Sequence, residues 1–337
     1  MSDPAPSRLE LRERAWYRAA VFAVLIAVLV ASLLLGISVG SIRLSVPEIV
    51  TSIFGPDTFE WHRVVWDIRL PRVLIGALVG MNLAVAGVIL QAVMGNPLAD
   101  PGIIGISSGA GLAGMALLVV FPARQEALPL FAFVGALAAA FIIYVLAWRD
   151  GIQPIRVILA GVAVSALCGA GISAVMVLFS DMVQGTLNFM NGALIMKGWA
   201  EFRLLWPYSV IGLAFAVVAV SRLDVIVLGD DVARGLGMGV TANRIFLTAI
   251  AALLAASAVA AVGLLGFVGL IVPHIMRMVL STSHRLLVPG SMLAGAGLVV
   301  LSDSLARSLF SPLEIPVGII MSVIGVPFFL FLLRRAL

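Results

Sequence analysis

Residues 69–102 read RLPRVLIGALVGMNLAVAGVILQAVMGNPLADPG, and this stretch decides the fold. Its uncharged run, Val73–Ala99, is long enough to cross a bilayer core, because a helix needs roughly 20 apolar residues to do so. The prolines and glycines that follow Met94 cannot continue a regular helix. The stretch therefore predicts a transmembrane helix that ends in an irregular turn.

Comparable apolar runs lie on both sides of this stretch. The Ile245–Met276 run contains three glycines and a proline near its end, so we expect a full helix followed by a short one. Together the runs predict about ten membrane crossings. The runs besides Val73–Ala99 are Ala19–Ile42, Pro101–Ala123, Ala127–Trp148, Val157–Ser180, Leu204–Ser221, Ile245–Met276, Leu286–Ser302, and Ile315–Pro327 continued by Phe328–Leu333.

The composition agrees with this reading. Of the 337 residues, 62% are hydrophobic and 11% are charged, against about 25% charged residues in an average soluble domain. The mean hydropathy is +1.17. These values exclude a nucleic-acid-binding protein, a coiled coil and a disordered chain. They predict an all-α, polytopic membrane protein.

Several chemistries lack the residues they need. Lys197 is the only lysine and is not part of a phosphate-binding loop, so we expect no ATP site and no other cofactor on this chain. Cys168 is the only cysteine, and the three histidines lie far apart in the sequence. We therefore predict no disulfide, no metal site and no catalytic residues.

The arginine distribution predicts the orientation. Arginines precede the first apolar run, which has no cleavage site, so residues 1–18 read as a cytoplasmic N-terminal segment rather than a signal peptide. Ten crossings return the C-terminus to the cytoplasm, and the cytoplasmic segments then carry the excess of arginine. We expect one transmembrane domain, 1–337, packed through small residues such as Gly76, Gly80, Gly105 and Gly109.

Polar residues mark four segments as candidate functional sites. In the first, Arg69 and Arg72 lie at a helix start, where positive charge is unfavourable for the helix dipole. They are expected either to bind a partner or to reach lipid headgroups. The second is the turn Met94–Gly102, which is either a gate or an ordinary tight loop.

The third segment is Arg222–Arg244, which we predict to be cytoplasmic. Asp230 and Asp231 suit a first helical turn and Gly237 suits a helix end, so a short helix off the membrane is expected to dock a cytoplasmic partner. In the fourth segment, Asp303 and Arg307 are four residues apart. We favour a local ion pair there over a functional intramembrane carboxylate.

Four motifs occur together in one order: Arg-Leu-Pro-Arg at 69–72, Asn-Pro-Leu-Ala-Asp-Pro-Gly at 96–102, Gly-Phe-Val-Gly-Leu-Ile-Val-Pro-His-Ile-Met-Arg at 266–277, and Glu-Ile-Pro-Val-Gly at 314–318. With them, residues 15–335 resemble the permease family of type II ABC importers, which take up ferric siderophores, haem or vitamin B12. The resemblance implies a second permease copy, identical or related, two cytoplasmic ATPase subunits that bind ATP and Mg²⁺, and a periplasmic or lipid-anchored binding protein. It also implies a bacterial cytoplasmic (inner) membrane.

The resemblance assigns roles to particular residues. Arg69, Arg72 and Arg307 match the arginines that dock the binding protein, and Asn96 and Leu98 match one translocation gate. Pro154 and Ile155 match a second gate, where this chain departs from the small hydroxyl residues of the vitamin B12 permease. The 224–243 loop matches the ATPase-coupling region, through the residues Asp230, Asp231, Arg234, Gly235, Leu236 and Gly237.

Among the family's substrates, we expect a ferric siderophore, with haem and vitamin B12 as alternatives. Two other classes are less consistent with the chain. An ion-coupled secondary transporter normally carries ionisable residues near the bilayer midplane, and an intramembrane enzyme would need a catalytic dyad or metal ligands within its helices.

Overall fold

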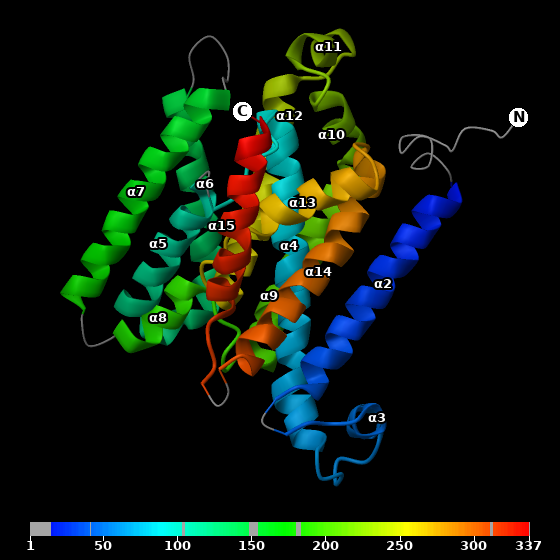
Figure 1. Cartoon of the computed structure of the whole chain (residues 1–337). Coiled ribbons are helices and arrows are strands. Elements are labelled where there is room, and N and C mark those ends of the chain that lie inside the picture. The colour runs from blue at the N-terminus through cyan, green and yellow to red at the C-terminus, as the bar shows by residue number, and fades with distance from the viewer. Residues whose placement is uncertain are drawn as a thin grey trace, which may run out of the picture.

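The computed structural model describes residues 15–40, 42–102, 105–147, 154–179, 183–310 and 313–336. These residues form a bundle of helices (Figure 1). Seven helices are long and apolar enough to cross a membrane. They are α2 (Ala15–Ser38), α4 (Leu70–Met94), α6 (Leu128–Ala147), α7 (Pro154–Leu178), α9 (Trp199–Val218), α12 (Val240–Val262) and α14 (His284–Ser308).

Three shorter helices are also apolar: α5 (Ile106–Val120), α13 (Val268–Val279) and α15 (Val317–Ala336). Together with the seven long helices they match the expected crossings, so the predicted all-α membrane fold is confirmed. The predicted division of the Ile245–Met276 run is also confirmed, because α12 ends at Val262 and α13 begins at Val268. The connecting segments are α3 (Val46–Phe54), η1 (Val64–Arg69), η2 (Pro122–Ala127), α8 (Val183–Asn191), α10 (Val220–Ile226) and α11 (Asp230–Gly235).

Helix α4 forms the centre of the bundle. It packs against α14, α12, α13 and α9, and nearly all of its residues from Val79 to Met94 are buried. Small residues allow this close packing: a Cβ added to Gly80 would lie 2.1 Å from the carbonyl oxygen of Gly295 on α14. The predicted packing role of Gly80 thus holds, as it does for Gly109, where an added Cβ would lie 2.5 Å from Gly135 of α6.

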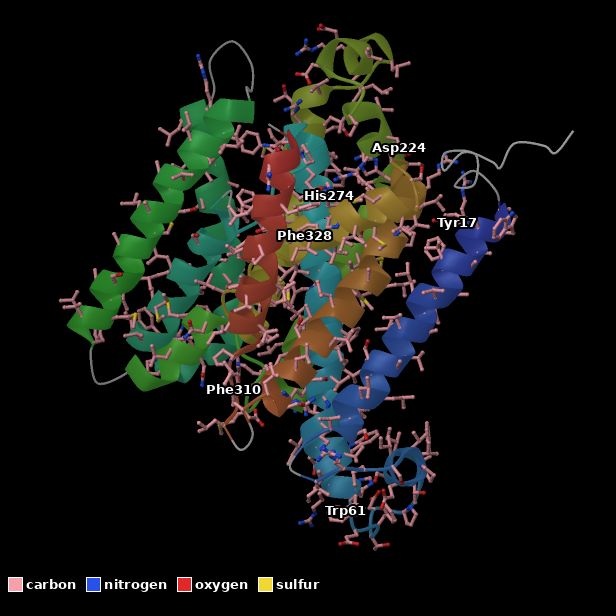
Figure 2. The ribbon with its side chains drawn as sticks, viewed as in Figure 1. Tyr17, Trp61, Asp224, His274, Phe310 and Phe328 are labelled. Carbon is pink, nitrogen blue, oxygen red and sulfur yellow. The ribbon has the colours of Figure 1, made fainter. Side chains whose placement is uncertain are left out.

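The two ends of the bundle carry different short elements (Figure 1). Helices α10 and α11, the start of α2 and the end of α15 lie toward one end, called the α11 end here. Helix α3 lies at the opposite end, the α3 end, near Trp61 (Figure 2). The Glu48 carboxylate caps the start of α3 by accepting hydrogen bonds from the Ser45 backbone N–H and hydroxyl, and these hold the pKa of Glu48 below its ordinary value.

Candidate docking, gating and coupling sites

A buried ion-pair network lies at the α3 end. Arg72 of α4 binds Asp303 of α14 through two hydrogen bonds, from Nε to Oδ2 at 3.0 Å and from Nη2 to Oδ1 at 2.9 Å. Its Nη1 donates to Oε2 of Glu314 at 2.8 Å. Arg307 Nε lies 3.3 Å from Asp303 Oδ2, which gives the expected local ion pair. Asp303 is therefore compensated by two guanidinium groups.

Arg307 and a further buried arginine, Arg69, bind the end of α2 through their guanidinium groups. Arg69 donates to the carbonyl oxygens of Ile37, Ser38 and Ile42, at 2.6, 3.1 and 2.6 Å. Arg307 donates to the carbonyl oxygens of Gly36 and Val39, at 2.8 and 3.0 Å. The last carbonyls of a helix have no partners within that helix and carry its negative dipole end, so two cations stabilise them here.

The three arginines thus have partners inside the chain. Arg69, Arg72 and Arg307 are only 5%, 6% and 9% exposed, so none extends toward lipid headgroups. The accessible member of the network is Glu314, whose side chain is 41% exposed. The pairing of Arg72 with Asp303 could not be predicted from local sequence, because the two residues are 231 positions apart.

The predicted gate turn, residues 95–102, is called the gate loop here. It follows α4 at the α11 end, and its first residue, Gly95, has a φ of +58°, which favours glycine. The Asn96 Oδ1 accepts the Leu98 N–H at 2.9 Å, and the Asp100 Oδ1 accepts the Gly102 N–H at 2.8 Å. Side-chain hydrogen bonds therefore fix the loop's shape, and Asn96 and Leu98 are half-buried.

The second predicted gate is described only in part. Pro154 and Ile155 are the first two residues of α7, and their side chains lie outside the described part of the chain, as does residue 153.

The predicted short helix off the membrane is α11. It begins at Asp230 after Gly229, which has a φ of +96°, and Gly237 ends it with a φ of +79°. Arg244 of α12 contacts the Asp230 carboxylate at 2.7 Å. Arg234 contacts Asp230 at 3.6 Å and Asp231 at 3.3 Å.

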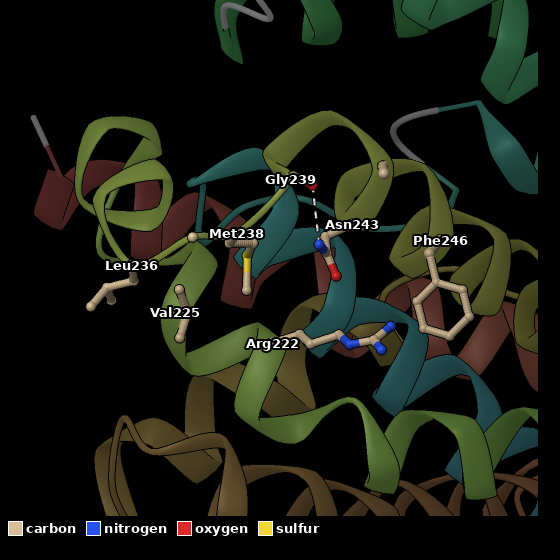
Figure 3. Close-up of a pocket in the computed structure, with 9 residues that line it drawn as sticks. Arg222, Val225, Leu236, Met238, Gly239, Asn243 and Phe246 are labelled. Atoms are coloured by element: carbon tan, nitrogen blue, oxygen red, sulfur yellow. Dashed lines mark hydrogen bonds between the residues drawn. The ribbon is translucent and has the colours of Figure 1, made fainter.

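Apolar side chains are exposed on and directly after α11, beside the charged side chains of Asp231 and Arg234. Val232 is 51% exposed and Leu236, directly after the helix, is 64% exposed. A cavity of about 570 Å³ lies beside Leu236, between the α11–α12 turn and α10. Figure 3 shows Arg222 beneath this cavity, with its guanidinium carbon 4.9 Å from the centre of the Phe246 ring. The α11 end therefore presents an apolar surface next to a cation.

Two buried or half-buried polar contacts were missed by the sequence reasoning. Gln91, near the end of α4, is 3% exposed and bonds both the gate loop and α13. The only signal was a polar amide inside an apolar run. Asp224 of α10 binds His284 of α14, and Figure 2 places Asp224 at the α11 end. Among the described residues, no group of three or more His, Cys, Asp or Glu side chains is arranged to hold a metal ion.

The seven long apolar helices and the three shorter ones define a multi-pass helical membrane protein. Residues 27–335 match the FecCD transport family, and the chain belongs to that family. It is therefore the permease component of a type II ABC importer, a class that works with an ATPase and a binding protein.

Named relatives agree with this assignment. The chain is 39% identical to the Fe(3+)-citrate import system permease protein YfmE of Bacillus subtilis, over 92% of this chain and 93% of that one. It is 38% identical to the hemin transport system permease protein HmuU of Yersinia pestis, over 82% of this chain and 84% of that one. A solved structure titled as an inward-facing metal-chelate type ABC transporter superposes with a TM-score of 0.81 and 27% identity, over 94% of this chain and 99% of that one.

Proposed function

We propose that this chain is one of two permease subunits of an importer that carries a ferric siderophore into the bacterial cytoplasm. Two ATPase subunits, which bind ATP and Mg²⁺, drive the transport, and the permease itself holds no cofactor. The observation that carries this proposal is α11. This helix stands off the bundle with Val232 and Leu236 exposed, as a surface that docks another protein would require.

In this proposal the α11 end faces the cytoplasm and both termini lie on that side of the inner membrane. The residues that contact the ATPase are Asp230, Asp231, Arg234, Gly235, Leu236 and Gly237. The cavity beside Leu236 supports this role, because its apolar lining can receive a side chain of the ATPase. The ion pair of Asp230 with Arg244 ties the start of α11 to α12.

The α3 end then faces the binding protein. Arg69, Arg72 and Arg307 form the docking cluster, and the carboxylates of the binding protein approach Arg72 by replacing Glu314. Two features support this exchange. Glu314 is the accessible partner in the network, and Arg72 keeps its two hydrogen bonds to Asp303 when Glu314 moves away.

Asn96, Leu98, Pro154 and Ile155 form the cytoplasmic gate of the pathway. ATP shifts the two permease copies between inward-open and outward-open arrangements only if the ATPases bind it with different affinity in the two states. The structure of residues 95–102 supports this role, because they form an irregular segment at the end of the central helix and side-chain hydrogen bonds hold its shape.

A ferric chelate is the proposed substrate, because the relative YfmE is named for iron citrate. Haem is the first alternative, since HmuU is named for hemin, and vitamin B12 is the second. Titration of the cognate binding protein with a ferric siderophore, hemin and cobalamin distinguishes the three. Tightest binding of hemin or cobalamin would refute the siderophore assignment.

Transport itself is tested in proteoliposomes that contain the permease, its ATPase and a luminal ATP supply, with the loaded binding protein outside. We expect uptake of ⁵⁵Fe only when all three proteins and ATP are present. Uptake by the permease alone would contradict the proposal.

A further inference from the structure

One buried amide ties the gate loop to a neighbouring helix. The side-chain Nε2 of Gln91 donates to the carbonyl oxygen of Ala99 in the gate loop at 3.2 Å, and to that of Gly269 in α13 at 3.0 Å. Its Oε1 accepts a hydrogen bond from Arg277, also in α13. Both N–H groups and the oxygen of this amide are therefore in use.

The sequence of α13 explains why Gly269 needs this donor. In a regular helix, the carbonyl oxygen of Gly269 would accept the N–H of residue 273, but that residue is Pro273 and has no N–H. Gln91 supplies the missing hydrogen bond from α4. The amide thus repairs a gap in α13 and holds Ala99 of the gate loop at the same time.

The backbones meet closely at this point. A Cβ added to Gly87 of α4 would lie 2.0 Å from the carbonyl oxygen of Gly269. A Cβ added to Gly269 would lie 2.8 Å from Asp100 Oδ2 and 3.0 Å from Pro101 Cδ, both in the gate loop. The helix α4, the helix α13 and the gate loop therefore form one tight junction, and a shift of α13 must move the loop or break the Gln91 bonds.

The other end of α13 is fixed to the α11 end of the bundle. His284 begins α14 shortly after α13 ends and is 3% exposed. Its backbone N–H and its Nδ1 lie 2.9 and 2.8 Å from Oδ1 of Asp224. Asp224 belongs to α10, the helix that directly precedes α11 and packs against both α14 and α11. The corner between α13 and α14 is thus held to the element that carries α11.

We propose that α13 transmits the movement of α10 and α11 to the gate loop, with Gln91 as the positioning residue at the gate and the Asp224–His284 pair as the attachment at the other end. The inference rests on the proposed function, since it assigns the loop a gating role and α11 a coupling role. It adds which residues connect the two.

The test uses a single cysteine in the gate loop. Cys168 is the only cysteine of the chain, so Cys168→Ala with Leu98→Cys gives a parent with one reporter thiol. The permease is assembled with its ATPase and reconstituted. The labelling rate of residue 98 by a membrane-impermeant maleimide is measured without nucleotide and with ATP and vanadate. The parent is expected to show a nucleotide-dependent rate.

Gln91→Glu is the central variant. Glutamate keeps the side-chain length and can still accept from Arg277, but its carboxylate has no N–H for Ala99 and Gly269. We expect the labelling rate without nucleotide to rise about tenfold, because the loss of two hydrogen bonds can change an equilibrium by about this factor. Addition of nucleotide should then change the rate no further. Asn82→Leu is the control, because it removes the hydrogen bonds of another buried amide of the same helix without adding a buried charge. Asn82 bonds Ser209 and Ser257, and both serines keep their hydrogen bonds to backbone carbonyls. The Asn82→Leu variant should keep the parent's response.

Two more variants separate the steps. Asp224→Ala should keep slow labelling, because the Gln91 bonds remain, but lose the response to nucleotide. Pro273→Ala restores a backbone N–H that competes with Gln91 for the carbonyl oxygen of Gly269. Alanine also favours a helix, so this variant should fold even where Gln91→Glu does not. We expect it to raise labelling without nucleotide about two- to threefold.

The outcomes separate the two levels of the proposal. Suppose that labelling of the parent depends on nucleotide. If Gln91→Glu and Pro273→Ala then label like the parent, the role of Gln91 is overturned. A preserved response in Asp224→Ala would overturn the attachment at the other end. A parent that does not respond to nucleotide, although its ATPase is active, would overturn the gating role and this inference with it.

Discussion

At the residue scale, the three buried arginines of the α3 end, Arg69, Arg72 and Arg307, serve the chain's own structure. Arg69 and Arg307 stabilise the last carbonyls of α2, while Arg72 compensates the buried Asp303. Removing one partner of such a network leaves the other polar groups buried without hydrogen bonds. The docking role proposed for these positions is therefore linked to stability, and variants must be chosen to separate the two.

Arg69→Gln is expected to destabilise the protein. Three carbonyl oxygens lose a charged donor, and each unsatisfied buried group costs about 1–3 kcal/mol. The thermal unfolding midpoint in detergent should fall. Arg63→Gln is the control, since Arg63 lies nearby and is exposed. Equal midpoints for the two variants would contradict the stabilising role of Arg69.

Glu314→Gln is expected to strengthen docking of the binding protein. The substitution removes the negative charge that competes for Arg72. The glutamine oxygen can still accept from Arg72 Nη1, and Asp303 still compensates the guanidinium, so the fold should be little affected. We expect a several-fold lower Kd and a steeper salt dependence in surface-binding measurements. Glu126→Gln changes an exposed acid elsewhere and should leave the Kd unchanged. Weaker docking of Glu314→Gln would refute the exchange of partners.

At the scale of elements, the sequence predicted what local pattern determines. The apolar runs located the transmembrane helices, and Asp230 and Gly237 located α11, because membrane length and helix caps act over a few residues. Contacts between distant elements have no such pattern. The bond from Gln91 to Gly269, across 178 positions, depends on how α4 and α13 cross.

Two glycines of α11 provide a matched test of this element. A Cβ would meet no other atom within 4 Å at Gly235 or Gly237, but only Gly237 has a positive φ, of +79°. Gly237→Ala should therefore cost about 1–2 kcal/mol and distort the helix end. We expect ATP hydrolysis to become uncoupled from uptake, measured as ATP consumed per iron imported. Gly235→Ala should strengthen the helix. The same stoichiometry in both variants would contradict a coupling role that depends on the helix end.

At the scale of the whole molecule, close backbone contacts hold the bundle together. Lipid tails are as apolar as the helix surfaces, so helices associate through packing and hydrogen bonds rather than through the hydrophobic effect. Helix α4 contacts α14 at Gly80 and α13 at Gly87. The number of helices was predictable from hydropathy, whereas their arrangement follows from these crossing points.

Gly80→Ala tests this arrangement. The added methyl group would lie 2.1 Å from the carbonyl oxygen of Gly295, so α4 and α14 must separate, and overpacking of this kind typically costs about 1–3 kcal/mol. We expect a lower unfolding midpoint in detergent. Gly169→Ala places a methyl group in open space on α7 and should leave the midpoint unchanged or slightly raised. A midpoint for Gly80→Ala as high as that of Gly169→Ala would argue against this crossing.

The arginines that fasten α2 recognise main-chain oxygens, which every amino acid carries. The five acceptors, at Gly36, Ile37, Ser38, Val39 and Ile42, keep their oxygens whatever side chains stand there. Substitutions that change only the side chains of this segment therefore keep these hydrogen-bond acceptors, whereas substitutions of Arg69 or Arg307 remove the donors. An exhaustive substitution library should consequently tolerate many replacements at Val39 and Ile42, few at the closely packed Gly36, and almost none at Arg69 and Arg307.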